Sequence, residues 1–409
     1  MRVIVAGAGI TGLTTALELA RIGIQVEVHE AAPQLSPLGV GINLLPHSVR
    51  ILHELGLRET LLSKGVETRE LVYFNRLGQR IWQEPRGRWA GYEQPQISLH
   101  RGALQMTLLD AARATAGVTV TTDSRLVGFD QESEGVTAHF ATAAGERRSV
   151  QGDVLIACDG IHSATRRSFY PDEGAPIYAG RILWRGVTHA KPFLSGATMI
   201  MAGWQDQKFV CYPIETEKDG LQPINWIAEL TRPDLANRED WNRPGVLADF
   251  LPPFESWDFG WLNAPELIRN AERVFEYPLV DRNPVDRWTF GRVTLAGDAA
   301  HPMYPIGSNG ASQGILDARA LSEAFRAHAD PQAALAAYEA VRRPATGAIV
   351  LANRGNGPEQ CMQLAHERAP DGFADIEDVI PREELEAISA RYKQVAGFSK
   401  DALASKARP

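Results

Sequence analysis

The sequence predicts an α/β protein in which a Rossmann-like domain carries an inserted mixed or antiparallel β-sheet domain and is followed by a C-terminal helical segment. Three observations predict this fold. A βαβ pattern with a glycine-rich turn opens the chain, short alternating runs rich in aromatic residues fill its middle, and a polar helical pattern closes it. With 409 residues, the chain exceeds what one hydrophobic core usually serves, so we expect more than one domain.

The first element is a βαβ unit of about 30 residues. Residues 3–6 form a short apolar run bounded by glycine, which is typical of a buried strand. Residues 13–20 place apolar side chains at helical spacing, and residues 25–28 form a second strand. A signal peptide would extend the first apolar run to a cleavage site, whereas this run ends in a glycine-rich turn.

The turn after the first strand has the spacing G-x-G-x-x-G, with Gly7, Gly9 and Gly12. Gly7 permits a tight turn, Gly9 lets the backbone approach a pyrophosphate, and Gly12 allows close packing of helix on strand. Glu30, 18 residues after Gly12, is placed to bind a ribose diol, and its charge disfavours a 2′-phosphate. An isolated motif could be a plain turn between a strand and a helix. The strand before it, the helix after it and Glu30 together predict that it binds a dinucleotide, which could be NAD or FAD.

The middle of the chain has a different texture. Residues 71–97 and 181–278 are rich in aromatic side chains and in short alternating runs, which predict strands of a second domain inserted at two points. The tryptophans there include Trp82, Trp184, Trp204, Trp226, Trp241, Trp257 and Trp261. Such residues mostly form core, but an aromatic wall beside a cofactor also suits a flat, apolar substrate.

Two further segments follow apolar strands. Asp159-Gly160 ends one strand and, taken alone, is a common turn. The segment 297–312, GDAAHPMYPIGSNGAS, separates another strand from a helical pattern and is unusually rich in glycine, proline and small residues. A ligand very close to the backbone would explain this composition, and a flexible loop without a ligand is the alternative.

The totals exclude several classes of protein. The net charge of −8 disfavours nucleic acid and anionic membranes as partners, and no apolar run is long enough to span a bilayer. The three cysteines are too few and too far apart for a disulfide framework or a metal site, so we expect no metal and a cytoplasmic protein. The helical tail, 346–409, predicts a packing element or a dimer contact, leaving monomer and homodimer open.

The order of three motifs, the glycine-rich turn, Asp159-Gly160 and Gly297-Asp298, resembles the FAD-dependent aromatic hydroxylases, the single-component flavoprotein monooxygenases with the para-hydroxybenzoate hydroxylase fold. The resemblance covers about residues 1–345. It implies that an FAD-binding domain comprises residues 1–70, 98–180 and 279–345, and that a substrate domain comprises residues 71–97 and 181–278.

The resemblance also implies which residues hold a non-covalent FAD. Asp298 would bind the ribityl chain, and the backbone from Pro305 to Gly310, with Gly307 and Asn309, would lie against the isoalloxazine ring. The following helix would point its amides at the flavin N1–C2=O region, where reduction places negative charge. Further contacts are implied for Val40, Gly41, Arg101 and Asp159, and Asp159 would also serve the nicotinamide nucleotide.

A surface salt bridge is the alternative for Arg101, and His301 is interpreted as structural. Ser312 stands where family members often carry Asn, so the polar contact of that Asn is not carried over to this chain.

The chemistry implied by the resemblance needs no metal or Ser-His-Asp arrangement. NADH or NADPH would bind transiently and reduce FAD, and O2 would form a flavin C4a-hydroperoxide that oxygenates an electron-rich aromatic ring. The protein would bind and orient the substrate and exclude water. No acid or base is assigned, and the pocket candidates are Trp184, Arg185, Tyr212, Tyr304 and Pro305, with core packing as the alternative for the aromatic ones.

A narrower similarity, to phenazine hydroxylases, rests on four segments: PLGVGIN (37–43), WRGVT (184–188), DWNR (240–243) and MYPIGSNGAS (303–312). It implies an aromatic or N-heteroaromatic, phenazine-like acid as substrate, hydroxylated with or without decarboxylation, and Arg181 or Arg185 as the cation for its carboxylate. The alternatives are a hydroxylase of a monocyclic phenolic acid such as a hydroxybenzoate, a flavin-binding protein without hydroxylase activity, and an NAD-dependent dehydrogenase.

Overall fold

The computed structural model describes residues 1–37, 39–235 and 243–399. Leu38 and most of the DWNR segment, including Trp241, therefore lie outside the described residues, as do the last ten residues of the predicted helical tail.

The first sheet is built around the predicted βαβ unit. Its strand order is β19-β20-β12-β1-β2-β8, and all neighbours are parallel except β19 and β20. The strands are β1 (Arg2–Ala6), β2 (Gln25–His29), β8 (Val118–Thr121), β12 (Val154–Ala157), β19 (Thr289–Phe290) and β20 (Val293–Leu295). Residues 3–6 are buried, as expected of a parallel strand covered on both faces.

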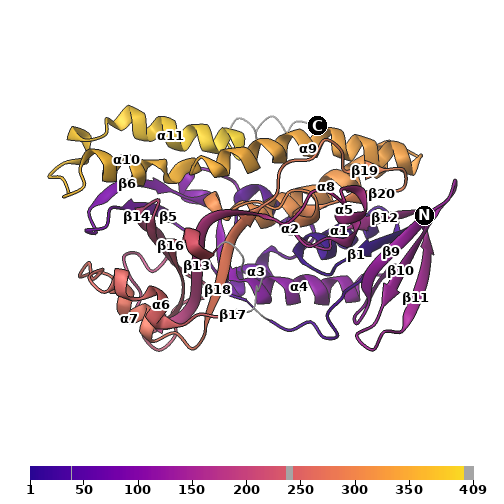
Figure 1. Cartoon of the computed structure of the whole chain (residues 1–409), viewed down its shortest axis with the longest axis horizontal. Helices are drawn as coiled ribbons and strands as arrows, with labels where there is room; N and C mark the ends of the chain where they lie inside the picture. The colour runs from indigo at the N-terminus through magenta and orange to yellow at the C-terminus, as the bar shows by residue number, and fades with distance from the viewer. Residues whose placement is uncertain (38, 236–242, 400–409) are drawn as a thin grey trace.

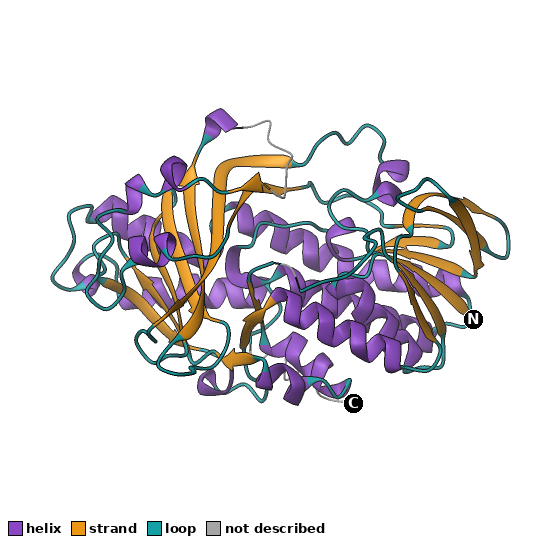
Figure 2. Cartoon of the chain, turned by 90° about the horizontal axis from the view of Figure 1, so that it is seen from below, coloured by secondary structure: helices purple, strands orange, loops and turns teal. Residues whose placement is uncertain are grey.

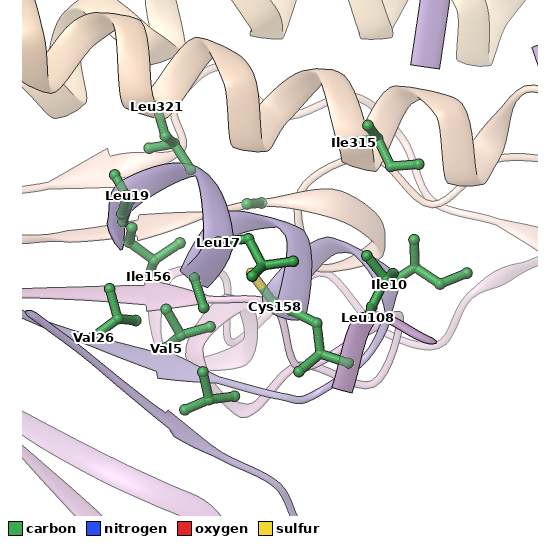
Figure 3. Packing of buried hydrophobic residues seen from close by; sticks show 14 of the residues in the cluster. Val5, Ile10, Leu17, Leu19, Val26, Leu108, Ile156, Cys158, Ile315 and Leu321 are labelled. Carbon is green, nitrogen blue, oxygen red and sulfur yellow. The ribbon is translucent and has the colours of Figure 1, made fainter. Parts of the chain in front are cut away.

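Helices cover this sheet and form the main core with it. The principal ones are α1 (Ile10–Ala20), α4 (Arg101–Ala114), α8 (Gly310–Ala327) and α9 (Pro331–Arg354). Figure 3 shows Leu17 and Leu19 of α1 between the strand residues Val5 and Ile156 and the α8 residue Leu321. The helix that follows the glycine-rich turn is therefore enclosed between the sheet and α8.

The second large sheet is mixed, as predicted. Its strand order is β17-β18-β13-β16-β15-β14-β5-β6, in which only β14 and β5 pair in parallel. The strands are β5 (Glu70–Phe74), β6 (Arg80–Pro85), β13 (Ile177–Ala190), β14 (Thr198–Trp204), β15 (Gln207–Pro213), β16 (Gln222–Thr231), β17 (Arg243–Pro244) and β18 (Val274–Asp281). Its residues come from the two regions predicted to form an inserted domain, with short extensions on either side.

The two large sheets lie toward opposite ends of the molecule, with helices between them (Figure 2). Two three-stranded antiparallel sheets complete the strands. One contains β3 (Gly41–Leu44), β4 (Gly65–Glu67) and β7 (Ile97–His100), and the other contains β9 (Arg125–Gln131), β10 (Val136–Ala141) and β11 (Arg147–Gly152).

Short helices connect the sheets and flank them. They are α2 (Pro46–Glu54), α3 (Arg58–Ser63), α5 (Ala164–Phe169), α6 (Leu247–Phe250) and α7 (Ala264–Arg269), with 3-10 turns η1 (Gly87–Ala90), η2 (Pro233–Leu235), η3 (Pro252–Phe254), η4 (Gly297–Ala299), η5 (Ile306–Ser308), η6 (Gly357–Glu359) and η7 (Ile376–Asp378). Among the described residues, no helix is both long enough and apolar enough to cross a membrane.

The C-terminal helices α10 (Gln360–Arg368) and α11 (Arg382–Val395) extend from α9 over the β5, β6 and β14 edge of the mixed sheet (Figure 1). Cys361, Met362, Ala365 and Leu385 of these helices share a hydrophobic cluster with Leu71, Met199 and Val210 of that sheet. The predicted helical tail is thus a packing element that joins the two halves of the chain.

Candidate active site

A cavity of about 390 Å³ lies where the N-termini of α1 and α8 face the mixed sheet. Seven of the predicted cofactor residues line it: Gly9, Gly41, Arg101, Asp298, Pro305, Asn309 and Gly310. The predicted pocket residues Arg185 and Tyr212 line it as well. The fold therefore brings together segments that are up to about 300 residues apart in the sequence.

The three glycines of the first turn differ in what surrounds them. Gly7 has a φ of +101°, and a Cβ there would lie 2.4 Å from the carbonyl oxygen of Cys158. A Cβ on Gly12 would lie 2.0 Å from the carbonyl oxygen of Gly7, whereas a Cβ on Gly9 would have no neighbour within 4 Å. Gly7 and Gly12 therefore serve packing, and only Gly9 opens onto free space at the start of α1.

Glu30 follows β2 and lies beside the same turn. Its carboxylate accepts hydrogen bonds from the backbone N–H of Ala8 (2.7 Å) and from that of Ala32 (2.9 Å). The side chain is partly exposed and does not line the cavity. Its carboxylate fixes the glycine-rich turn, and a role in binding the adenosine ribose remains a proposal.

Asp159 lies beside the cavity, at the end of β12. Its Oδ2 accepts from the backbone N–H of Ala164 (2.9 Å), and its Oδ1 has no hydrogen-bond partner among the described residues. Burial raises the pKa of this carboxyl group, opposed by hydrogen bonds from Ser163 and from backbone N–H groups. The neighbouring residues Cys158 and Gly160 line the cavity itself.

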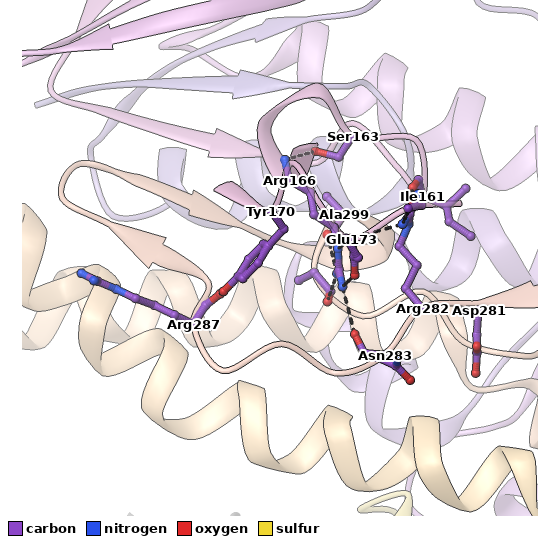
Figure 4. Close-up of polar contacts among 12 residues, drawn as sticks. Ile161, Ser163, Arg166, Tyr170, Glu173, Asp281, Arg282, Asn283, Arg287 and Ala299 are labelled. Carbon is purple, nitrogen blue, oxygen red and sulfur yellow. Dashed lines mark hydrogen bonds and ion pairs between the residues drawn. The ribbon is translucent and has the colours of Figure 1, made fainter. Parts of the chain in front are cut away.

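Arg166 connects the Asp159-Gly160 segment to the Gly297-Asp298 segment. Its Nη1 donates to the carbonyl oxygens of Ala299 (3.1 Å) and Ala300 (2.7 Å), and its Nη2 donates to that of Asn283 (2.9 Å). Figure 4 shows this guanidinium surrounded by its acceptors, with Glu173 as the ion-pair partner. Because Arg166 is 1% exposed, these bonds hold the two predicted cofactor segments in a fixed relation.

Asp298 points into the cavity from the turn after β20. Its side chain is exposed to the cavity, which is itself enclosed by protein. Burial raises the pKa of its carboxyl group, while His301 and Arg101 act in the opposite direction. No carboxylate of the described residues forms an ion pair with Arg101, which lines the cavity at the start of α4.

His301 is structural in this arrangement, as predicted. Its Nε2 lies 2.6 Å from Oδ2 of Asp317, which also accepts from the backbone N–H of Gly297 (2.8 Å), while Oδ1 accepts from Nε of Arg342 (2.7 Å). Burial alone would raise the pKa of Asp317, but His301 and Arg342 lower it to about 2. This buried network fixes the turn from which Asp298 projects.

The loop from Pro305 to Gly310 has the backbone that its composition predicts. Gly307 and Ser308 have φ values of +66° and +56° in succession. The α8 helix starts at Gly310, its N-cap residue Asn309 makes no side-chain capping bond, and Nδ2 of Asn309 has no partner among the described residues. The N-terminal amides of an 18-residue helix therefore face the cavity, which favours negative charge there.

The second flavin loop predicted from the sequence is tied to the mixed sheet. The backbone N–H of Gly41 donates to Oδ1 of Asn225 (2.7 Å), and a Cβ on Gly41 would lie 2.6 Å from the Asn225 Cβ. The carbonyl oxygen of Val40 accepts from the backbone N–H of Arg101 (2.9 Å). Val40 itself is buried and does not line the cavity.

Ser312, where family members often carry Asn, makes contacts within the protein. Its Oγ accepts from the backbone N–H of Leu45 (3.2 Å) and lies 3.0 Å from Oγ of Ser48. The residue is fully buried, so it stabilises the packing of α8 on α2.

Not all of the predicted pocket residues line the cavity. Arg185 and Tyr212 lie on the cavity face of the mixed sheet, whereas Trp184 lies on the opposite face, where it stacks on Phe250 at 4.8 Å. Tyr304 is buried with Leu183, Leu279 and Ile306 and does not line the cavity. For Trp184 and Tyr304 the structure thus gives core packing, the alternative considered from the sequence.

Among the described residues, no tryptophan lines the cavity, so core packing rather than an aromatic wall accounts for them. Trp184, Trp226 and Trp257 belong to the hydrophobic core on the far face of the sheet. The apolar side chains that line the cavity from this sheet are instead Leu183, Met199, Met201, Val210, Ile227 and Leu279. The composition of the inserted region did not predict this, because aromatic content alone does not say which face a residue takes.

Sequence reasoning also missed three charged residues of the cavity. Lys208, Glu229 and Glu359 line it, and each is less than a tenth exposed. Two-residue alternation from Tyr212 along β15 would have placed Lys208 on the same face. No local pattern points to Glu359, because it comes from the C-terminal segment.

The residues present fit an FAD. Its diphosphate needs backbone N–H groups with space before them, which Gly9 supplies at the start of α1. Its polar groups need protein atoms that are not already hydrogen-bonded within the protein. Such atoms lie beside or within the cavity: Oδ1 of Asp159, Nδ2 of Asn309 and the carboxylate of Asp298. No covalent attachment is suggested by Cys158, because burial raises the pKa of its thiol far above its ordinary value.

Comparison with known proteins supports this assignment. A family model described as an FAD binding domain matches residues 1–232 and 272–352. A phenazine 1,6-dicarboxylic acid hydroxylase from Lysobacter antibioticus is 44% identical over 361 residues, which cover 86% of this chain and 89% of that protein. A 3-amino-4-hydroxybenzoate 2-monooxygenase from Streptomyces platensis is 33% identical and covers 88% of both chains.

The solved structures agree on the fold. The structure of Klebsiella pneumoniae HpxO complexed with FAD and uric acid superposes with a TM-score of 0.75 at 24% identity, and the match covers 98% of this chain and 97% of that one. The family model matches more than half of the chain, and the two relatives cover 86% and 88% of it. The protein therefore belongs to the FAD-dependent aromatic hydroxylases, and it is a flavoprotein monooxygenase.

Proposed function

We propose that this enzyme uses NADH or NADPH and O2 to hydroxylate a flat aromatic or N-heteroaromatic carboxylate, and that phenazine carboxylates are its substrate class. The observation that carries the proposal is Arg185, a cation that lines the cavity without a carboxylate partner among the described residues. The 44% identical relative named for a phenazine dicarboxylic acid supports the choice of ring.

Arg185 is placed to receive an anionic substituent. Its Nη2 donates to the carbonyl oxygen of Gly41 (2.8 Å), and its buried Nε has no hydrogen-bond partner among the described residues. The other arginine considered, Arg181, already donates to Glu229 (2.9 Å). A substrate carboxylate at Arg185 would form a charge-assisted hydrogen bond, worth about 1.5–3 kcal/mol.

The apolar wall next to Arg185 suits a flat ring. Met201, Val210 and Ile227 form an uncharged row across three neighbouring strands, because Met201 pairs with Val210 and Val210 with Ile227. Methionine adapts to irregular shapes and makes favourable contacts with aromatic rings. The substrate ring would lie along this row with its carboxylate toward Gly41.

The chain's own task in the reaction is to bind, orient and exclude water. When bound, FAD supplies the reduction and oxygen-transfer chemistry. The amides at the start of α8 would stabilise negative charge that develops at the cofactor, since they face the cavity without a side-chain cap. Tyr212, whose pKa burial raises to about 12 against the opposing charge of Arg185, stays protonated at neutral pH and can donate a hydrogen bond.

Oxygen consumption coupled to NAD(P)H oxidation tests the proposal. Phenazine-1-carboxylate should stimulate both in the FAD-loaded protein, and Arg185→Met should raise KM by about tenfold or more while FAD remains bound. Arg80→Met is the control, because Arg80 is an exposed arginine of β6 in the same sheet. Equal KM values in Arg185→Met and wild type would refute the role of Arg185.

A second candidate is a monocyclic phenolic acid. It is favoured by the 33% identical relative, whose name gives a substituted hydroxybenzoate as substrate. Tightly coupled turnover of a hydroxybenzoate, with phenazines inert, would select this candidate.

A further inference from the structure

The far end of the cavity from Gly41 holds a buried cluster of four charged residues, called here the Lys208 cluster. Nζ of Lys208 lies 2.5 Å from Oε2 of Glu359 and 3.0 Å from Oε2 of Glu229, and Nη1 of Arg181 lies 2.9 Å from Oε1 of Glu229. These four residues are between 2% and 7% exposed. Lys208, Glu229 and Glu359 also line the cavity.

The Lys208 cluster is electrically neutral, with two cations and two carboxylates. Burial alone would lower the pKa of Lys208, but Glu229 and Glu359 raise it, so the ammonium stays charged at neutral pH. Lys208 is shared between the two carboxylates, and Arg181 is paired with Glu229. No cation of the cluster is therefore left for a further anion.

The position of the cluster follows from the strand register. Arg185 pairs with Ile227, and Lys208 pairs with Glu229 two residues farther along β16. Strand geometry then separates Arg185 from Lys208 by about 12 Å between Cα atoms. On the strand between them, Ile227 pairs with Arg185 and Glu229 pairs with Lys208. The substrate wall thus has one unpaired cation at one end and a neutral, carboxylate-bearing cluster at the other.

We propose that the Lys208 cluster determines specificity by selecting monocarboxylate over dicarboxylate substrates, so that the enzyme accepts an aromatic ring with one carboxylate at Arg185. This inference rests on the proposed function and names its substrate class more narrowly. A second carboxylate at the far end would face Glu229 and Glu359 in a site that water screens poorly. A ring nitrogen, hydroxyl or amino group there would find a donor in Lys208 or an acceptor in the two glutamates.

The test compares matched monoanions and dianions. Phenazine-1-carboxylate is compared with phenazine-1,6-dicarboxylate, and 3-hydroxybenzoate with 5-hydroxyisophthalate, by kcat/KM and by Kd from quenching of flavin fluorescence. Wild type should favour each monocarboxylate by about tenfold or more. Glu229→Gln and Glu359→Gln each add one net positive charge at unchanged size, and each should shift the ratio toward the dianion by about tenfold.

Glu276→Gln is the matched control, since Glu276 is an equally buried carboxylate on the same sheet whose Oε2 accepts from Nε1 of Trp184 on the opposite face. The ratio of kcat/KM for the monocarboxylate to kcat/KM for the dicarboxylate should be the same in Glu276→Gln as in wild type. Two glutamine variants are used because one of them could fail to fold, and bound FAD in each variant reports an intact site.

The outcomes separate this inference from the proposed function. If the phenazines are inert but the monocyclic pair shows the expected charge selection, the phenazine assignment is wrong and the specificity role of the cluster stands. If wild type favours the dianions, or if neither glutamine variant changes the ratio, the specificity role is refuted. If none of the four acids binds or stimulates turnover, both proposals are refuted.

Discussion

The hydroxyl group of Tyr392 donates a hydrogen bond of 2.9 Å to the carbonyl oxygen of Ile306, so helix α11 supports the loop predicted to lie against the flavin ring. The Tyr392 ring also packs closely against Gly307, because a Cβ on Gly307 would lie 2.1 Å from the Tyr392 hydroxyl oxygen. The same hydroxyl lies 3.2 Å from Oδ1 of Asn353 in α9. The C-terminal segment therefore helps to fix the loop from Pro305 to Gly310.

We predict that Tyr392→Phe folds but loosens this loop. Loss of a buried hydrogen bond of about 0.5–1.5 kcal/mol should weaken FAD binding by a few fold and increase the hydrogen peroxide released per NAD(P)H oxidised. Equilibrium dialysis of FAD and a peroxide assay measure the two effects. Tyr92→Phe is the control, since its hydroxyl donates to the carbonyl oxygen of Phe398 (2.7 Å). Equal peroxide release from both variants would contradict the prediction.

Substitutions of two glycines in the first turn should have opposite signatures. Gly12→Ala places a Cβ 2.0 Å from the carbonyl oxygen of Gly7, so it should destabilise the fold by several kcal/mol, as overpacking in a core does. Gly9→Ala meets no protein atom within 4 Å, so its thermal stability without FAD should match wild type while FAD affinity falls. Melting curves with and without FAD distinguish the two. If Gly9→Ala binds FAD as tightly as wild type, the prediction that the FAD pyrophosphate lies at this turn is wrong.

Asp298→Ala should lose most of the bound FAD, because it removes an anionic acceptor that faces the cavity. A charge-assisted hydrogen bond of about 1.5–3 kcal/mol corresponds to roughly 10- to 150-fold in affinity. Glu30→Ala should weaken FAD less, since its carboxylate does not line the cavity and mainly accepts from Ala8 and Ala32. The absorbance of flavin that co-purifies with each variant measures the effect. If both variants keep FAD as tightly as wild type, the site assignment fails.

Asp317 should make stability depend on pH in the acid range. Its pKa of about 2 lies below the ordinary value of 3.8, so its contribution is complete above about pH 4 and is lost as the pH falls toward 2. The shift corresponds to about 2 kcal/mol. Asp317→Asn should therefore be less stable than wild type by about that amount at pH 7, with a smaller difference at pH 3.

Urea unfolding at both pH values gives the comparison for Asp317. Because other carboxylates titrate in wild type and variant alike, only the difference between the two proteins reports on Asp317. A difference that is the same at pH 7 and pH 3 would show that the interactions of Asp317 with His301 and Arg342 do not depend on its charge.

The features that depend on local backbone requirements could be predicted from the sequence. A strand, a tight turn and a helix in succession specify the places of Gly7, Gly9 and Gly12, because each glycine is required by an atom a few residues away or by open space at a helix start. The composition of the segment 297–312 likewise indicated a backbone that a ligand approaches, and it has two successive residues with positive φ. These features, together with the order of the motifs, were sufficient to identify the fold and the family.

Which side chains share the cavity depends on tertiary packing. Trp184 and Arg185 are adjacent in β13, and the alternation of a strand sends one to the core and the other to the cavity. Which face of the sheet lines the cavity depends on what packs against each face, and the sequence of the strand does not show this. Glu359 reaches Lys208 from 151 positions away because α9 carries the chain across the molecule, so the neutrality of the far end of the cavity follows from long-range packing alone.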